Sequence, residues 1–246
     1  GRNNYQFYSK SMNAAALQRL TLENKLRRAL ERQEFLLHFQ PQIDVRSWSI
    51  VGAEALIRWR HPELGLVSPA EFIPLAEETG LILPVGEWVL RTACAQARAW
   101  QKVRKGTLLM AINISGRQFR EKNLVQTIDQ AIQATGLDPR GVEIEITESI
   151  LMRGVEETIN TLKALKEMGL RISVDDFGTG YSSLNYLRRF PIDTLKLDQS
   201  FTREVVTDRN TAAIVSAVIA MAHGLGIEVI AEGVETPEQR TFLFEE

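Results

Sequence analysis

The 246-residue chain has little of several residue types that define common classes of protein. It has one cysteine, Cys94, which excludes an intrachain disulfide and a zinc site built on cysteines. Its three histidines, His38, His61 and His223, are not spaced as metal ligands. No apolar run reaches the roughly 18 residues of a membrane span, and no signal peptide opens the chain. We therefore expect a cytoplasmic domain that does not itself contact a membrane.

A strong excess of charge of one sign is also missing. The 29 basic and 31 acidic residues leave a net charge of −2 at pH 7. This balance gives no reason to expect a groove for DNA or RNA or a surface for anionic membranes. A small phosphorylated ligand needs only local positive charge and stays compatible. Hydrophobic residues make up 44% of the chain, which is ordinary for a globular domain with a sizeable core.

Short apolar segments alternate with amphipathic helical patterns along most of the chain. Strands are expected at 35–43, 48–59, 108–114, 142–147, 171–174, 194–197 and 228–231. Helices are expected at 12–32, 70–78, 84–104, 117–135, 154–168, 182–189 and 209–224. Ser68-Pro-Ala-Glu71 and Thr236-Pro-Glu-Gln239 have the form of helix-starting capping boxes. The alternation predicts an α/β fold with a mainly parallel sheet and helices outside.

Two details refine this fold. The link at 44–47 is too short for a crossover helix, so the first two strands should be antiparallel. Seven strands are one fewer than a closed (β/α)8 barrel needs, so either the sheet is open or a TIM-like barrel lacks its last strand in this chain. A protein that ended at Glu246 would then expose sheet edges, and we expect it to be poorly stable and weakly active. Residues 1–11 are expected to be a linker or the tail of an upstream domain, and 12–246 the barrel.

A polar residue interrupts or ends almost every predicted strand. These residues are Glu54, Asn113, Glu145, Asp175, Asp176, Lys196 and Glu232. Parallel strands put their C-terminal ends on one face, where barrel enzymes carry their chemistry. Taken singly, the Asp pair could be a solvated turn, and Glu54 could form a structural ion pair with Arg58. The occurrence of all seven at strand ends favours a common site.

The chemistry of such a site follows from its charges. Five carboxylates and one ammonium cannot share a small volume without further cations. Oxygen ligands without histidine or cysteine suit Mg²⁺ or Mn²⁺ better than Zn²⁺. One acid of an Asp-Asp pair can bridge two ions, and two ions about 3.5–4 Å apart are typical of phosphoryl hydrolysis. Glu232 could orient or deprotonate the water, and Lys196 could polarise water or phosphate. The sequence predicts a metal-dependent phosphate-ester hydrolase without identifying its substrate.

Other motifs give weaker evidence of function. Gly178-Thr-Gly180 lacks the third glycine and the acid of a dinucleotide-binding fingerprint, which excludes that interpretation. His38 is expected in a strand as a hydrogen-bonded core group. His61 is expected in a loop and His223 at a helix end.

Several longer motifs occur in a fixed order. They are Val51-Gly-Ala-Glu54-Ala-Leu-Ile-Arg-Trp-Arg-His-Pro62, Phe72-Ile-Pro-Leu-Ala-Glu-Glu-Thr-Gly80, Asn113-Ile-Ser115, Glu145-Ile-Thr-Glu-Ser149, Asp175-Asp-Phe-Gly-Thr-Gly-Tyr-Ser-Ser-Leu184, Lys196-Leu-Asp198 and Ala231-Glu-Gly-Val-Glu235. Over about residues 20–246 the chain resembles the EAL domain, the bacterial cyclic di-GMP phosphodiesterase family. The opening Gly1-Arg-Asn-Asn-Tyr5 resembles the end of a GGDEF (diguanylate cyclase-like) domain. This resemblance implies the C-terminal part of a two-domain signalling protein.

The resemblance implies a TIM-like barrel with an antiparallel first strand and hydrolysis of cyclic di-GMP to linear pGpG. The ligands it implies for a first Mg²⁺ or Mn²⁺ ion are Glu54, Asn113, Glu145 and Asp175. It implies Asp175 and Asp176 as ligands of a second ion, and Glu232 as a metal ligand or general base. Lys196 would hold the attacking water.

Further positions carry implied roles. Glu148 would steady the loop from 176 to 183. The positions that match substrate-holding ones are Gln40, Leu56, Arg58 and Asp198. The planar guanidinium of Arg58 suits a phosphate or a guanine.

The family also implies a homodimer and a further strand, absent here, that supplies an active-site glutamine. The rival interpretation is a degenerate EAL domain that binds cyclic di-GMP without cleaving it. Such domains usually lose metal ligands or the loop motif, whereas this chain has every acid, the asparagine and the lysine, which favours catalysis. A purely structural barrel would not need these acids.

Overall fold

The computed structural model describes residues 10–103, 108–178 and 187–246, with side chains from residue 19 onwards. Its elements are α1 (Lys10–Ala29), β1 (Phe35–Ile43), β2 (Ile50–His61), β3 (Gly65–Val67), α2 (Pro69–Thr79), α3 (Ile82–Val103), β4 (Leu109–Asn113), α4 (Gly116–Phe119), α5 (Leu124–Thr135), β5 (Val142–Thr147), α6 (Glu148–Leu151), α7 (Val155–Glu167), β6 (Arg171–Phe177), β7 (Thr194–Leu197), α9 (Gln199–Glu204), α10 (Arg209–Gly224), β8 (Glu228–Ala231) and α11 (Pro237–Glu245). They form two compact units, Gly1–Leu36 with Ile57–Val85 and Leu37–Leu56 with Gly86–Glu246.

One sheet carries the strands in the order β1-β2-β4-β5-β6-β7-β8, with β3 paired to β2. From β2 through β8, every neighbouring pair along this order is parallel. The β1 and β2 strands are neighbours joined by residues 44–49, a link too short for a crossover, so they run antiparallel. The predicted α/β fold with a mainly parallel sheet is confirmed.

The sheet of the second unit is strongly curved. Four strand steps separate β2 from β7, which is about 19 Å in a flat sheet. The Lys196 Nζ atom on β7 nevertheless lies 3.1 Å from Glu54 Oε2 on β2. Only a sheet that curls toward its polar face allows this contact, so these strands form part of a TIM-like barrel wall.

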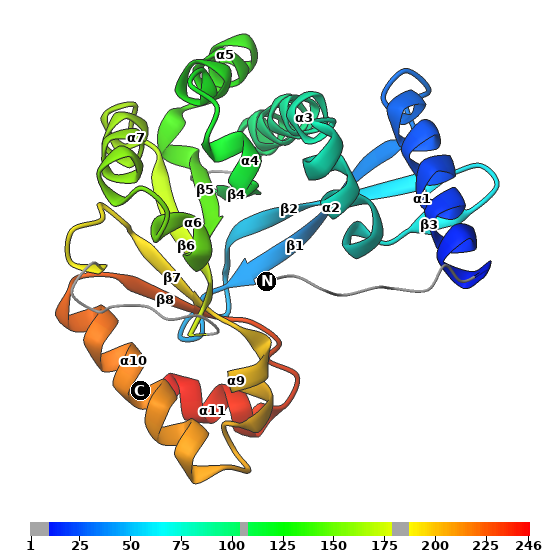
Figure 1. Ribbon diagram of the computed structural model, residues 1–246. Helices are drawn as coiled ribbons and strands as arrows, with labels where there is room; N and C mark the ends of the chain where they lie inside the picture. Colours follow the sequence, from blue (N-terminus) through cyan, green and yellow to red (C-terminus); the bar gives the residue numbers. More distant parts are fainter. Residues whose placement is uncertain (1–9, 104–107, 179–186) are drawn as a thin grey trace. The chain divides into compact units, whose positions relative to one another are not determined.

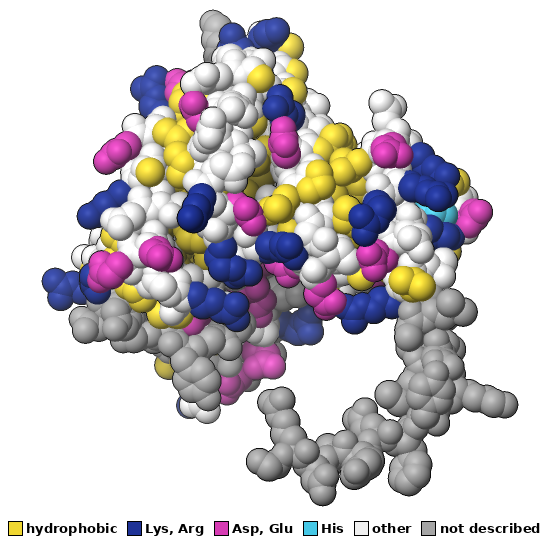
Figure 2. Space-filling model, turned by 45° about the horizontal axis from the view of Figure 1, so that its top comes forward, with side chains coloured by type: hydrophobic (Ala, Val, Ile, Leu, Met, Phe, Trp, Pro, Cys, Tyr) yellow, Lys and Arg dark blue, Asp and Glu magenta, His cyan; other side chains and the backbone are white. Residues whose placement is uncertain are grey.

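Alternation along each strand separates the polar inside of the curl from the helices. On β5, Val142, Ile144 and Ile146 alternate with Glu143 and Glu145, and all five are buried. The apolar side chains face the outer layer, in which α7 lies along β6 and α10 along β8 (Figure 1). On the face shown in Figure 2, acidic and basic side chains are interspersed, consistent with the net charge of −2.

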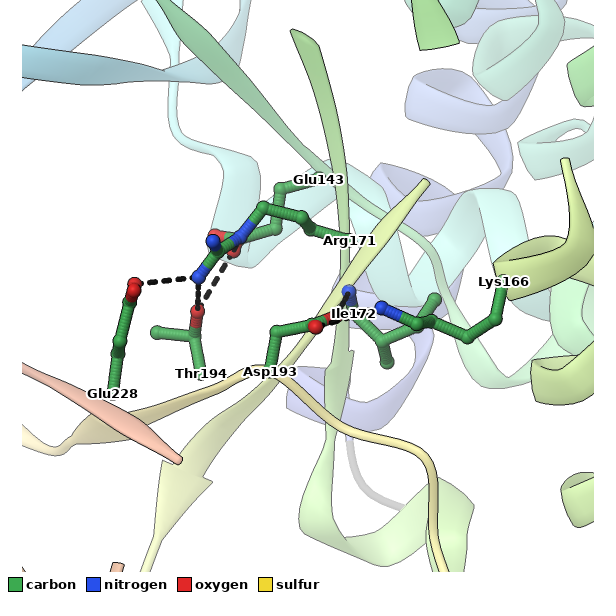
Figure 3. A network of polar contacts seen from close by, with 7 residues as sticks. All are labelled: Glu143, Lys166, Arg171, Ile172, Asp193, Thr194 and Glu228. Atoms are coloured by element: carbon green, nitrogen blue, oxygen red, sulfur yellow. Dashed lines mark hydrogen bonds and ion pairs between the residues drawn. The ribbon is translucent and has the colours of Figure 1, made fainter. Parts of the chain in front are cut away.

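A charged network joins the N-terminal ends of four strands (Figure 3). Arg171, at the start of β6, donates to Thr194 Oγ1 at 3.2 Å and to Glu228 Oε2 at 2.5 Å. Its Nε lies 3.5 Å from Glu143 Oε2, which also accepts a hydrogen bond of 2.9 Å from Thr194. Glu143 is fully buried, and burial raises the pKa of its carboxyl group despite these contacts. Arg171 therefore ties β5, β7 and β8 to β6.

A second ion pair in the same view joins α7 to the segment before β7. The Lys166 Nζ atom lies 2.6 and 2.7 Å from the two carboxylate oxygens of Asp193. Asp193 also accepts a hydrogen bond of 2.8 Å from the backbone N–H of Ile172. This pair is partly exposed, unlike the carboxylate cluster described below.

The first unit has an aromatic core around Trp59. Its ring is fully buried, lies 6.1 Å from the ring of Phe35 and 5.7 Å from that of Phe72, and donates Nε1–H to Glu34. His61 ends β2 and is buried, and its Nδ1 accepts from two backbone N–H groups of the following turn. The prediction that His61 lies in a loop is therefore wrong, because the strand extends two residues further than its apolar run.

Other differences from the sequence predictions have local causes. His38 lies on β1, as predicted, but is exposed rather than a core group, because β1 is at the edge of the sheet. The helix expected at 117–135 is two helices, α4 and α5. The short elements β3, α6 and α9 were not predicted, and most of the helix expected at 182–189 lies outside the described residues.

The helix ends agree better with the predictions. The capping box at Thr236 is confirmed. Ser68 is the N-cap of α2, but its side chain makes no capping bond. His223 lies in the last turn of α10, as expected. Over the described ranges, no helix combines the length and the apolar character needed to cross a membrane.

Candidate active site

A lysine surrounded by carboxylates lies at the C-terminal ends of the parallel strands in the second unit. The Lys196 Nζ atom is 2.8 Å from Glu232 Oε1, 3.1 Å from Glu54 Oε2, 3.1 Å from Glu145 Oε2 and 3.3 Å from Asp175 Oδ1. The Lys196 and Glu145 side chains are 1% and 0% exposed. Four acids predicted from four different strands are thus brought within ion-pair distance of one lysine nitrogen.

The local sequence explains this convergence. Each of the contributing side chains points into the curl, while its apolar neighbours on the strand point toward the helices. The parallel register sets Asn113 on β4 beside Glu145 on β5. The Asn113 Nδ2 atom donates to Glu54 Oε1 at 2.7 Å, which fixes the carboxylate of β2 from the neighbouring strand. Asn113 therefore belongs to the same cluster.

The cluster strongly perturbs its own ionisation. Burial alone would lower the pKa of Lys196, but the surrounding acids, Glu145 foremost, raise it well above its usual range. Burial raises the pKa of Glu145 well above its ordinary value, and Glu54 and Asp175 add to the rise while Lys196 opposes it. Burial also raises the pKa of Glu232, against the effect of Lys196. The lysine therefore stays protonated, but its single positive charge does not balance the four carboxylates around it.

The second acid of the Asp pair lies near the end of β6, where the pairing with β7 is irregular. Asp176 adopts a φ of +55°, a left-handed conformation that is uncommon outside glycine, and its N–H donates to Asp175 Oδ1 at 3.0 Å. Burial and the neighbouring Asp175 raise its pKa. Two residues on, the N–H of Gly178 donates to Glu148 Oε2 at 3.1 Å. Glu148 is buried at the start of α6, so it fixes the beginning of the turn; residues 179–183 lie outside the described chain.

The donor set suits a divalent cation although the acids face the lysine. Among the described residues, no three acidic, histidine or cysteine side chains are arranged so that they could hold a metal ion. Instead, four carboxylates turn toward one ammonium group. The Glu145 Oε1 atom is buried and has no hydrogen-bond partner within the described part of the chain. An excess of hard oxygen donors with one left unpaired fits Mg²⁺ or Mn²⁺.

The four predicted substrate-holding residues are more dispersed. Gln40 lies exposed on β1, and Leu56 is partly exposed on β2. Asp198 follows β7 and accepts a hydrogen bond of 2.9 Å from the N–H of Ser200, and its hydrogen bonds with Ser200 lower its pKa. Arg58 belongs to the first unit, where it donates to the carbonyl of Ile57 at 2.8 Å.

The sequence analysis missed two residues next to the site. Gln199 and Phe201, on α9, pack against glycines that follow the acids of β6 and β8. The sequence signal was a glycine just after each acid: Gly178 comes two residues after Asp176, and Gly233 directly after Glu232. A glycine at such a place indicates that another side chain packs closely against the backbone there.

Comparison with known proteins gives consistent matches over nearly the whole chain. A profile of the EAL domain family matches residues 23–245. The chain is 46% identical over 243 residues to the bifunctional diguanylate cyclase/cyclic di-GMP phosphodiesterase MucR of Pseudomonas aeruginosa, covering 99% of this chain and 36% of that protein. It is 43% identical over 245 residues to the cyclic di-GMP phosphodiesterase NbdA of the same organism, covering 100% of this chain and 31% of NbdA.

A solved structure, the PaMucR phosphodiesterase in a complex with c-di-GMP, has the same fold. Its TM-score is 0.88 at 44% sequence identity, and the match covers 92% of this chain and 91% of that one. The chain spans about a third of the length of the curated relatives it matches.

Proposed function

Because the chain belongs to the EAL domain family, we propose that it hydrolyses one phosphodiester bond of cyclic di-GMP to give linear pGpG. The observation that carries the proposal is the convergence of Glu54, Glu145, Asp175 and Glu232 on Lys196. Support also comes from the similarity to the PaMucR phosphodiesterase, whose structure contains c-di-GMP. A binding module or a structural barrel has no need of a buried excess of carboxylates.

The proposal includes two Mg²⁺ or Mn²⁺ ions. When bound, such ions activate the attacking water and neutralise charge on the phosphate and on the leaving oxygen. The residues that would hold them are Glu54, Asn113, Glu145 and Asp175 for the first ion and Asp175 and Asp176 for the second. The buried Oε1 of Glu145, which accepts no hydrogen bond in the described part of the chain, and the pKa of Asp176, which burial and Asp175 raise, support this assignment.

The protein's own groups take complementary roles. Lys196 supplies a fixed ammonium group that holds the attacking water or the phosphate. Because its side chain is buried, its electrostatic interaction with either one is stronger than in water. Glu232 is the proposed general base, or a further metal ligand. Burial raises its pKa, so its carboxylate is a stronger base than that of a free glutamate. Glu148 steadies the turn that follows Asp176 by accepting the hydrogen bond from Gly178 N–H.

Substrate contacts complete the proposed site. The residues that would hold the dinucleotide are Gln40, Leu56, Arg58 and Asp198. Arg58 offers a planar donor pair to a phosphate or a guanine. Asp198 is kept ionised by its capping bonds, so it can accept hydrogen bonds from a guanine base.

The proposal extends to the larger protein. An upstream GGDEF-like or sensory domain is supported by two observations. The chain matches only part of each relative, and the name of MucR includes a diguanylate cyclase beside the phosphodiesterase. A homodimer and a cytoplasmic setting stay predictions. Light scattering of the purified protein, with and without cyclic di-GMP, tests the dimer.

The function is tested by incubating the protein with cyclic di-GMP and Mg²⁺ or Mn²⁺ and separating the products by chromatography. Linear pGpG is the expected product, and Asp175→Asn should abolish it. Tight binding of cyclic di-GMP without any product, in both metals, would refute the proposal and favour the receptor alternative.

A further inference from the structure

The turn after β6 is in close contact with an aromatic side chain of α9. Gly178 has a φ of +95°, and a Cβ added there would lie 2.9 Å from both Cε2 and Cζ of Phe201. The ring edge of Phe201 therefore occupies the bare side of this glycine. The N–H of Gly178 is held by Glu148, so the turn is held by α6 and by α9.

The turn after β8 meets the same helix. Gly233 has a φ of +67°, and a Cβ added there would lie 2.8 Å from the Cβ atom of Gln199. The preceding residue, Glu232, donates its N–H to the carbonyl of Leu197 at 3.1 Å. The chain that carries the proposed base is thus packed against the segment that connects β7 to α9.

The α9 helix is itself well anchored. It starts directly after β7, and Asp198 caps it through the N–H of Ser200 at 2.9 Å. Thr202 and Val205 are each 2% exposed, so the side of the helix behind Phe201 is packed. Figure 1 shows α9 beside the ends of β7 and β8. An anchored helix therefore touches the turns that follow the acids of β6 and β8, and the strand directly before it, β7, carries Lys196.

We propose that Phe201 and Gln199 are positioning residues, through which α9 sets the distances of Asp175, Asp176 and Glu232 from Lys196. The expected effect on kcat rests on the proposed function. The expected effect on the positions of the carboxylates does not. The physical reason is that the acids repel one another and are held within about 3 Å of one ammonium group only by the backbone that carries them.

The test compares Phe201→Ala with Val205→Ala, a matched control that removes buried apolar volume from the end of the same helix. For each protein, the melting temperature, kcat and KM for cyclic di-GMP, and the Kd for Mn²⁺ of the substrate-free protein are measured, the last by electron paramagnetic resonance. Val205→Ala should lower the melting temperature and leave kcat and the Mn²⁺ Kd near wild-type values. Phe201→Ala should lower kcat by roughly 10–100-fold at little-changed KM and weaken Mn²⁺ binding about tenfold.

Two further comparisons exclude a merely structural role. Phe201→Leu should restore part of kcat, whereas Phe201→Tyr should not, because its oxygen is added to Cζ, one of the two ring atoms nearest Gly178. Gly233→Ala should lower kcat, and adding Gln199→Gly should recover part of the loss by removing the Cβ that it meets.

The outcomes separate this inference from the proposed function. If Phe201→Ala and Val205→Ala change kcat and the Mn²⁺ Kd alike for similar losses in melting temperature, the positioning role is overturned while the hydrolysis stands. If the wild type does not cleave cyclic di-GMP but Phe201→Ala selectively weakens Mn²⁺ binding, the positioning role stands and the proposed function fails. A wild type that neither cleaves nor binds Mn²⁺ overturns both.

Discussion

Replacing Lys196 by methionine removes the cation that, among the described residues, the four carboxylates share. Methionine keeps most of the apolar stem, so the change acts mainly on charge. In the absence of divalent metal, Glu145 would be left fully buried with Glu54 and Asp175 close by and no compensating charge. We expect Lys196→Met to be strongly destabilised without metal and to regain stability when Mg²⁺ is added.

The magnitude follows from the distances. At about 3.1 Å and an effective dielectric constant near 20, each ion pair is worth about 5 kcal/mol before desolvation. Desolvation of the lysine and repulsion among the acids cancel most of the sum, and breaking a buried pair typically costs about 3–5 kcal/mol. We expect a loss of this size at pH 8. At pH 5 the loss should be smaller, because the acids, Glu145 first, can take up protons instead.

The assay is urea unfolding at pH 5 and pH 8, with EDTA or with saturating Mg²⁺. A ligand at about 100 times its Kd stabilises the folded protein by about 2.7 kcal/mol. Lys166→Met is the matched control. In the described part of the chain Lys166 forms its ion pair with Asp193, and its side chain is 32% exposed, so we expect a loss of only about 1 kcal/mol. If Lys196→Met in EDTA at pH 8 is no less stable than this control, the carboxylates do not repel one another as strongly as the structure indicates.

Three further predictions concern other parts of the molecule. Glu148→Gln should lower kcat for cyclic di-GMP by about tenfold with little change in KM, since the acceptor for Gly178 N–H is weakened; an unchanged kcat would contradict this. Because the folded pKa of Glu143 is raised above its ordinary 4.5, its stability contribution is complete below that pH and is lost as the pH rises through the folded pKa. Urea unfolding should therefore show Glu143→Gln gaining stability relative to wild type from pH 5 to pH 8, and a constant difference would refute the shift. Burial raises the pKa of Cys94 to about 12, so the thiol should resist a thiol reagent until the protein unfolds, and rapid labelling of the native protein would contradict its burial.

Much of the fold could be predicted from periodicity. Glycines and apolar runs place the strands of the parallel sheet within a few residues, because a buried parallel strand has to be apolar on its outer face. The short helix α9 could not be predicted in this way. Its six residues are too few to show a helical period, and its start depends on the capping bond of Asp198.

The acids of the site could be predicted because each is a polar residue in an otherwise apolar strand. Which atoms meet could not be predicted. That Lys196 contacts Glu54 depends on how tightly four intervening strand steps curl, and curvature has no signature in either strand alone. The network of Arg171, Glu143, Thr194 and Glu228 was also missed, because it depends on the register of four neighbouring strands, which no single strand's sequence gives.

We propose that the carboxylates around Lys196 support attack of water on cyclic di-GMP with the help of divalent metal. The most direct measurement is turnover in ¹⁸O-labelled water, with Mn²⁺ or with EDTA, followed by mass spectrometry of the product. We expect the wild type in Mn²⁺ to form pGpG with one ¹⁸O atom in its 5′-phosphate, and we expect no such product in EDTA or from Asp175→Asn. Equal turnover by Asp175→Asn, or turnover that is unaffected by EDTA, would contradict it.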